Sequence, residues 1–533
     1  MTQEWRAAPD AERRVRIAVW PEREAVEHAE LWRALETLFP VEFDGAAPAA
    51  GAARVCFGGE AAAHGTRQPV FHASAGPGVL LAAGEMRFAT SAAVPEAFRG
   101  LRLRDPGCRC VGVLPVARRH AVLATCDGHP VWTARHDAPL VVASALPLPR
   151  LAPGEPLRLH FRPAAWAALL PLLHWLRQVS EPEWQGPPPR ASFVIDDPNL
   201  RRTRYGALDF HELATAARRE NFHAAVATIP LDLAQASDAA VRVFRDNREH
   251  LSLLAHGNNH TGNELAEQDA AACAGLARQA LRRMERFAER TGLVVERVMA
   301  APHGACSATM ASALAVAGFA AALISAGSLA RWNPELAAEA ALGMSPGWTL
   351  GGLPVLHRQG LRYVRTQAAL AHFLGQPVIF TAHHGDCDGG LERLREAARE
   401  CNAAASVRWM SPSAMSQSNY LLRAEREEVE VRMYSGQARV PLSREVRAAS
   451  VTVHGLGRVR IDADRSGVVP LCEGWLLMVS RTAASLELEV LPAAQPLAAR
   501  ARVSPWARAR RAMCEARDRM YPLFAAERPQ VLD

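Results

Sequence analysis

The stretch "LSLLAHGNNHTGNE", residues 251–264, changes character partway along its length. An apolar run ends at His256, and a Gly-Asn-Asn turn separates this histidine from His260. A short apolar run that stops at turn-forming residues is typical of a buried strand. The stretch therefore predicts a strand that presents two imidazoles at its carboxyl end.

The same alternation of apolar runs and polar turns extends over residues 191–422. Repeated strand–helix units build a parallel sheet or a closed barrel, and in both architectures chemistry gathers at the carboxyl ends of the strands. The predicted strands cover residues 191–196, 222–230, 251–256, 294–302, 321–325 and 377–384, and the predicted helices cover residues 209–221, 238–250, 264–290, 307–318 and 390–405.

The segments on either side of this central domain have different patterns. Strand, amphipathic helix and strand open residues 1–180 and predict an α/β domain, which a Pro-rich linker over 180–190 separates from the rest. A further helix of this domain is expected to open at Pro163. Short alternating runs over 423–495 predict a small all-β module, in the manner of a sandwich. An arginine-rich tail over 496–533 predicts a solvated amphipathic helix, with an arm for an anionic partner as the alternative. The fold class is thus α/β with an appended β module.

Composition narrows the possible functions. The chain has 533 residues, of which 49% are hydrophobic, and no uninterrupted apolar stretch approaches the ~18 residues that a membrane span needs. The N-terminus carries no signal-peptide pattern, so we expect a cytoplasmic protein. All 61 basic residues are arginine, which excludes lysine Schiff bases and a Walker lysine. The net charge of +6 is modest, and nothing in the sequence predicts a nucleic-acid partner.

In the central domain, histidine or aspartate stands at or just after the carboxyl end of four predicted strands. The residues are Asp196 and Asp197, His256 and His260, His303, and His383 and His384. Two imidazoles and one carboxylate suit zinc or another divalent transition metal, and three protein ligands leave a position open for water. The remaining carboxylate can act as general base, and a histidine across the site can protonate the leaving group. The backbone N–H of His303 can donate to an oxyanion.

The motifs "FVIDDPN", "HGNNH", "APHG" and "FTAHHGD", in this order, resemble those of the polysaccharide deacetylases, the NodB-homology family also called carbohydrate esterase family 4. The resemblance implies a distorted (β/α) barrel and a metal-dependent hydrolase that removes N- or O-acetyl groups from sugars. It implies that Asp196 is the base and that Asp197, His256 and His260 are the metal ligands. It implies a general acid at His383 or His384, of which we favour His383.

The chain departs from the family's motifs at three positions. Pro198 replaces the usual glycine, Ala300 stands where the family has an arginine that orients the base, and His303 stands where it has an aromatic residue. Either another residue replaces that arginine, or the domain is a metal-retaining, glycan-binding protein with weak or no catalysis. The expected substrate is an acylated sugar, zinc is the favoured metal, and the sequence leaves the oligomeric state open. We expect Arg201, Arg202 and Arg204 to lie in a solvated loop, with binding of an anionic substrate as the alternative.

Overall fold

The chain separates into two compact units. The computed structural model describes residues 14–45, 52–58, 68–112, 114, 120–135, 140–404, 406–443, 445–453, 459–463, 468–471, 474–478, 485–492 and 505–524. Within these ranges, unit 1 comprises residues up to 184 with 335–345 and 365–374, and unit 2 comprises 185–334, 346–364 and the residues from 375 onward. The four domain ranges expected from the sequence stay predictions.

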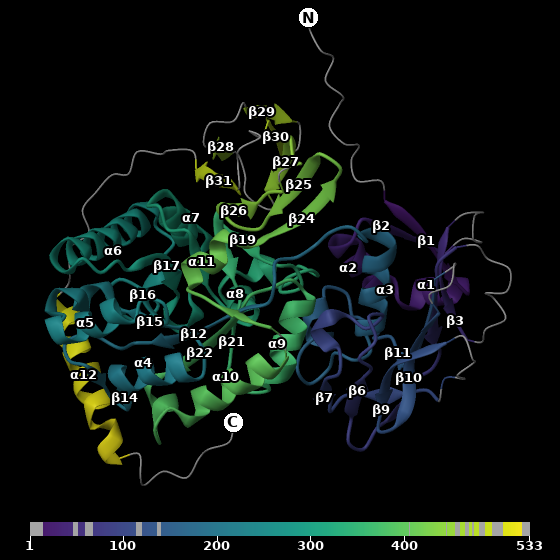
Figure 1. Ribbon diagram of the computed structural model, residues 1–533, viewed down its shortest axis with the longest axis horizontal. Helices are drawn as coiled ribbons and strands as arrows, with labels where there is room; N and C mark the ends of the chain where they lie inside the picture. Colours follow the sequence, from purple (N-terminus) through teal and green to yellow (C-terminus); the bar gives the residue numbers. More distant parts are fainter. Residues whose placement is uncertain are drawn as a thin grey trace, which may run out of the picture. The chain divides into compact units, whose positions relative to one another are not determined.

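Unit 1 contains a mixed sheet in the strand order β2-β1-β3-β4-β11-β10-β9-β6-β7 (Figure 1). The first five strands run parallel and the others antiparallel. Asp127 and Gly128 both have positive φ, 47° and 86°, as a tight hairpin between β9 and β10 requires. The strands are β1 (Val15–Trp20), β2 (Val41–Asp44), β3 (Ala53–Phe57), β4 (Val70–Ser74), β6 (Glu85–Phe88), β7 (Arg102–Arg104), β9 (Ala121–Cys126), β10 (His129–Arg135) and β11 (Val141–Pro147), with β5 (Val79–Leu80) and β8 (Arg109–Cys110) forming a separate pair.

Two helix predictions in unit 1 need correction. The helix expected to open at Pro163 begins instead as α3 (Leu170–Ser180), because Pro171 occupies its first turn, where a missing N–H costs nothing. The single helix expected after the first strand is divided at His28 into α1 (Glu22–Glu27) and α2 (Ala29–Leu38).

The central domain of unit 2 is a ring of parallel strands. The strand order is β19-β20-β18-β17-β16-β15-β12-β22-β21, in which β19 is antiparallel to β20. The parallel strands from β20 to β21 begin and end in one continuous stretch, residues 353–359. Its first part, β20, pairs with β18, and its second part, β21, pairs with β22, with only His357 between them. This stretch closes the sheet and confirms the predicted (β/α) barrel. The strands are β12 (Arg190–Asp196), β15 (Ala224–Thr228), β16 (Leu251–His256), β17 (Glu296–Ala300), β18 (Ala321–Leu323), β19 (Trp348–Leu350), β20 (Leu353–Leu356), β21 (Arg358–Gln359), β22 (Val378–His383) and β23 (Arg408–Trp409), with β13 (Arg204–Tyr205) and β14 (Leu208–Asp209) forming a separate hairpin.

Buried apolar side chains fill the barrel interior, and several of them are small, among them Ala225, Ala300 and Ala321. Six of the helices of unit 2 begin at a serine or aspartate whose side chain accepts a hydrogen bond from the first helical turn. The cap Asp269 explains why the helix expected from residue 264 begins only at Ala270. The helices are α4 (Phe210–Arg219), α5 (Asp238–Asp246), α6 (Ala270–Thr291), α7 (Ala308–Val316), α8 (Ala326–Trp332), α10 (Glu392–Ala404) and α11 (Pro412–Gln417), and α9 (Val364–Phe373) lies almost wholly in unit 1.

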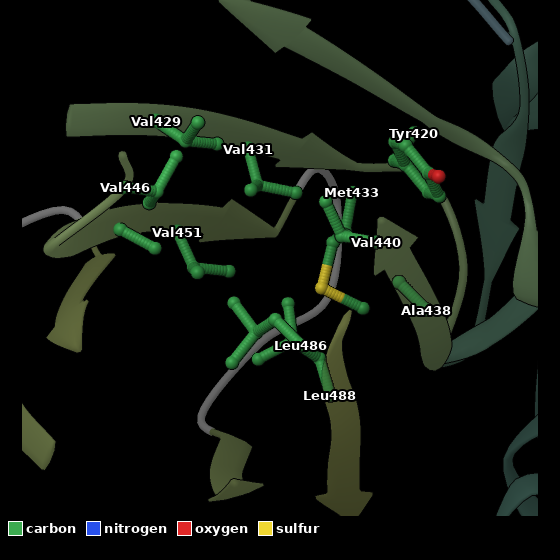
Figure 2. Close-up of a cluster of buried hydrophobic side chains, with 11 residues drawn as sticks. Tyr420, Val429, Val431, Met433, Ala438, Val440, Val446, Val451, Leu486 and Leu488 are labelled. Atoms are coloured by element: carbon green, nitrogen blue, oxygen red, sulfur yellow. The ribbon is translucent and has the colours of Figure 1, made fainter. Parts of the chain in front are cut away.

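The β module follows the barrel as two sheets with a shared apolar interior. One sheet has the order β24-β25-β27-β30-β29 and the other β26-β31-β28. Figure 2 shows Val431 and Val451 from the first sheet beside Leu486 from the second, as expected for a sandwich. The strands are β24 (Tyr420–Glu425), β25 (Glu428–Met433), β26 (Gln437–Pro441), β27 (Ala448–Val453), β28 (Val459–Ala463), β29 (Val468–Leu471), β30 (Gly474–Met478) and β31 (Ser485–Pro492).

The arginine-rich tail contains α12 (Pro505–Phe524). The rest of the predicted 496–533 tail lies outside the described residues. The expectation that this helix is merely solvated is wrong, because three of its charged side chains, Arg511, Glu515 and Asp518, are buried in unit 2. Among the helices that the structure describes, none has the length and apolar character needed to cross a bilayer. The cytoplasmic location stays a prediction.

Candidate metal centre

The register of the barrel strands brings the predicted site residues to one edge. Asp196 is the last residue of β12 and pairs with His383, the last residue of β22. His256 is the last residue of β16 and pairs with Ala300, the last residue of β17. Because all four strands are parallel, these ends and the loops that follow them share the carboxyl edge of the barrel.

Asp197, His256 and His260 converge at this edge. One potential ligand atom from each lies within 4.8 Å of the others. Asp197 Oδ1 is 3.6 Å from His256 Nε2 and 3.3 Å from His260 Nε2, and the two imidazole rings are 4.9 Å apart between centroids. A carboxylate and two imidazoles at this separation could hold one cation.

The backbone is strained where these ligands are presented. Asp197, His260 and His303 have φ values of 83°, 57° and 55°, in a region that residues other than glycine rarely adopt. Such conformations cost roughly 1–3 kcal/mol each and cluster at functional sites. Gly257 also has a positive φ, 62°, and a Cβ there would lie 2.5 Å from Glu264 Oε1. The "HGNNH" turn thus needs its glycine.

The side chain of Glu264 fixes the loop that carries His260. Its Oε1 accepts hydrogen bonds from the backbone N–H groups of Asn258, Asn259 and His260 at 2.6, 2.9 and 2.8 Å. Arg283, from α6, donates to the carbonyl oxygen of Asn258 at 3.0 Å. Sequence reasoning missed both residues, although Glu264 lies only four positions after His260. A carboxylate that follows a polar turn closely was the available signal.

The residues present fit a bound cation. His256 Nδ1 lies 3.0 Å from the carbonyl oxygen of Ala300, so the ring donates there and leaves Nε2 toward Asp197 as an acceptor. This partner is of the kind that orients metal-binding histidines. Asp197 Oδ1 is buried and receives no hydrogen bond of good geometry from the described part of the chain. A buried carboxylate oxygen without a donor favours a cation as its partner.

The electrostatics of the three groups also suit a cation. Burial alone would raise the pKa of Asp197, but His256 and His260 hold it well below its usual range. Burial opposes the charged form of His256, yet Asp196 and Asp197 raise its pKa above the ordinary value. Burial, followed by the proximity of His256, lowers the pKa of His260 to about 4. At neutral pH, Asp197 is therefore ionised and His260 neutral, the forms that bind metals.

Asp196 has an arginine partner that sequence reasoning did not find. Arg358 Nη2, from β21, lies 2.5 Å from Asp196 Oδ2, and both side chains are buried. Arg358 Nε also donates to Thr381 Oγ1 at 2.7 Å, which fixes the direction of the guanidinium group. Arg358, on the strand that closes the barrel, is thus a candidate for the residue that replaces the arginine absent at position 300. The only sequence signal was a basic residue directly after a short apolar run.

The remaining predicted residues occupy different places. The ring of His303 is 5.3 Å from that of His260. His383 is exposed and near enough to Asp197 to lower the pKa of that carboxyl, whereas His384 is buried. The His384 ring lies 5.5 Å from that of Tyr205, and its Nε2 is 3.7 Å from Asp518 of α12. The structure therefore brings His303 and His383 to the group of three and turns His384 toward α12.

The fold and the site together define a class of protein. Its members have a closed barrel of parallel strands, with a buried Asp-His-His group and an Asp-Arg pair at the carboxyl edge. No family model matches the sequence. No curated protein matches it either. A search of solved structures does give matches, among them members of carbohydrate esterase family 4.

Three of these structures illustrate the likeness. A family 4 carbohydrate esterase from Streptomyces lividans, in complex with acetate, is 15% identical over 43% of this chain and 97% of its own, with a TM-score of 0.27. A domain of a multidomain xylanase from the hindgut metagenome of Trinervitermes trinervoides is 10% identical over 42% and 88%, with a TM-score of 0.25. A pseudoenzyme from Bacillus anthracis is 9% identical over 42% and 64%, with a TM-score of 0.27. These matches assign no residue of this chain a role.

Proposed function

We propose that the central domain is a metal-dependent hydrolase that removes an acyl group, such as acetyl, from a sugar. The observation that carries this proposal is the convergence of Asp197, His256 and His260 within 4.8 Å, beside the buried pair of Asp196 and Arg358. A ligand group alone would fit a structural cation. The adjacent carboxylate, held by its own arginine, adds a base that does not belong to the ligand set.

The three ligand residues would bind the cation. Zinc is the favoured ion, because two imidazoles and a carboxylate form a frequent catalytic zinc site that leaves a further position open. A bound divalent cation would supply Lewis acidity toward the acyl carbonyl and toward water. The hydrogen bond from His256 Nδ1 to Ala300 would hold one ring in the orientation that binding needs.

Asp196 would accept the proton of the attacking water. Arg358 bonds Oδ2 of this carboxylate, while Oδ1 is buried and accepts no hydrogen bond from the described residues. One oxygen is thus anchored and the other available, which suits a general base.

His383 would donate a proton to the departing amine or alkoxide. It stands beside Asp196 in the strand register and is exposed, so it can face a substrate that enters from solvent. His384 is the less suitable acid because it is directed toward Asp518. The N–H of His303, in a turn with φ of 55°, is the candidate donor to the oxyanion.

The experiment measures metal and acetate together. Wild type should contain about one equivalent of transition metal by plasma mass spectrometry and should release acetate from acetylated sugars. The double variant His256→Ala/His260→Ala should lose both, whereas His250→Ala, on the turn before β16, should keep both. Wild type that binds no metal after reconstitution with zinc, cobalt or nickel would overturn the proposal. Metal without acetate release would favour the alternative of a glycan-binding protein.

A further inference from the structure

The C-terminal helix α12 has a charged buried face. Arg511, Glu515 and Asp518 are each only 4% exposed, although such residues are rarely buried without partners. The apolar side chains of Trp506 and Met513, by contrast, are 63% and 55% exposed. A helix attached by the hydrophobic effect would have the opposite pattern. The helix α12 is therefore held in place by polar contacts.

Those contacts are with the loops at the carboxyl edge of the barrel. Arg511 Nη2 lies 2.8 Å from Asp232, in the 3₁₀ turn Pro230–Gln235 that follows β15. Arg201 Nη1, in the loop after β12, lies 2.6 Å from Glu515, so the prediction that Arg201 is merely solvated is wrong. The polar contacts thus attach the middle of α12 to the loops that carry the metal centre.

Two further contacts extend this attachment along the helix. The hydroxyl of Tyr205 donates to Asp518 at 2.6 Å, and His384, after β22, lies 3.7 Å from the same carboxylate. A Cβ on Gly262, after β16, would lie 3.6 Å from Arg510 Nη1. The helix therefore crosses the loops that follow β12, β15, β16 and β22. Three of these strands, β12, β16 and β22, end in Asp196, His256 and His383.

The candidate ligands beneath these loops have little exposure. The side chains of His256, His260 and Asp197 are 3%, 12% and 22% exposed, while His303 and His383 are exposed. The site is open on the side of His303 and His383 and covered on the side of α12.

We propose that α12 roofs one side of the metal centre and restricts the substrate to a small acylated sugar or the end of a sugar chain. This inference rests on the proposed function. The interior of a polymer must enter and leave a site on opposite sides, and here one of those sides is occupied. A monosaccharide, or a terminal residue, needs only the open side.

The test uses full-length wild type and two variants that each place an arginine on α12. Glu515→Arg places a second guanidinium group next to that of Arg201 at the buried contact, where the two repel each other. Met513→Arg places the same side chain on the exposed face of α12. N-acetylglucosamine oligomers of increasing length are the probes, and mass spectrometry locates the residue that loses acetate. Wild type should act on terminal residues. Glu515→Arg should raise the ratio of internal to terminal hydrolysis about tenfold, and Met513→Arg should leave it unchanged.

Hydrogen–deuterium exchange on the metal-free proteins gives a readout independent of activity. Glu515→Arg should speed exchange about tenfold over residues 201–205 and 258–262, and Met513→Arg should not. The proposal that α12 covers the site would be wrong if Glu515→Arg left the exchange unchanged. It would also be wrong if wild type hydrolysed internal residues as readily as terminal ones. Faster exchange without acetate release from any probe would overturn the proposed function, and the substrate restriction with it. If Glu515→Arg fails to fold, Arg201→Gln breaks the same contact from the barrel side.

Discussion

Buried polar groups at the two ends of the barrel differ in their hydrogen-bond partners. At the amino end, the guanidinium of Arg190 donates to the carbonyl oxygens of Ser418 and Gly375, at 2.7 and 3.0 Å. His223 there bonds Ser192, and Glu296 accepts from the N–H of Ser413. At the carboxyl end, Asp196 Oδ1 and Asp197 Oδ1 are buried and accept no hydrogen bond from the part of the chain that the structure describes, and the backbone of Asp197 and His260 is strained.

Within one sheet, the polar groups at the amino end thus serve stability, and those at the carboxyl end serve ligand binding. Polar groups at the amino end join neighbouring segments of the chain, so their loss would lower the free energy of unfolding. At the carboxyl end, the side chains of Asp196 and Asp197 have oxygens available to a ligand, at the expense of stability. Substitutions at the two ends should therefore change different observables.

The largest expected effect is that of Asp196→Asn. The substitution keeps the shape of the side chain and removes its basicity, so kcat should fall by about 10²–10⁴ while metal content stays unchanged. Steady-state acetate release and plasma mass spectrometry measure the two quantities. Asp238→Asn, the same change at an exposed position on α5, should leave both unaltered. Full activity of Asp196→Asn would show that this carboxylate is not the base.

A smaller effect is expected at Arg358, which acts through Asp196. Arg358→Met should lower kcat roughly 10-fold, and Arg358→Lys should recover part of the loss, because lysine keeps the charge without the planar fork. A double-mutant cycle distinguishes this positioning role from general damage. In the Asp196→Asn background, Arg358→Met should lower kcat no further. Two independent, additive losses would contradict the role.

The sequence predicts those parts of the site that depend on short segments. Apolar runs that end in His256 or Asp196 indicate both the strand and its polar end, and parallel strands place such ends together. The resemblance to the deacetylase motifs then predicts which of these residues bind the metal and which act as base or acid. Glu264 was within reach of the same reasoning, because it lies in the quoted stretch itself.

The contacts that the sequence does not predict join distant segments. Arg358 and Asp196 are 162 residues apart, and β21, which carries the arginine, is too short to show a strand pattern. The buried face of α12 is equally hidden, because charged residues on a helix usually indicate a solvated surface. Only the partners of Arg511 and Glu515 on the barrel reveal that these residues are buried.

The smallest effect concerns the amino end, where His223 should influence stability and its pH dependence. Burial lowers the pKa of His223 to about 3 in the folded chain. In the unfolded chain this histidine has a pKa of about 6.5 and is protonated below that pH. The stability linked to this group is fully present above pH 6.5 and is lost as the pH falls toward 3. Between pH 7 and 5, the free energy of unfolding of wild type should fall about 2 kcal/mol more than that of His223→Gln. Urea unfolding at both values measures this, with the exposed His129→Gln as control. Equal losses in wild type and His223→Gln would mean that His223 is protonated in the folded chain, and the contrast between the two ends would weaken.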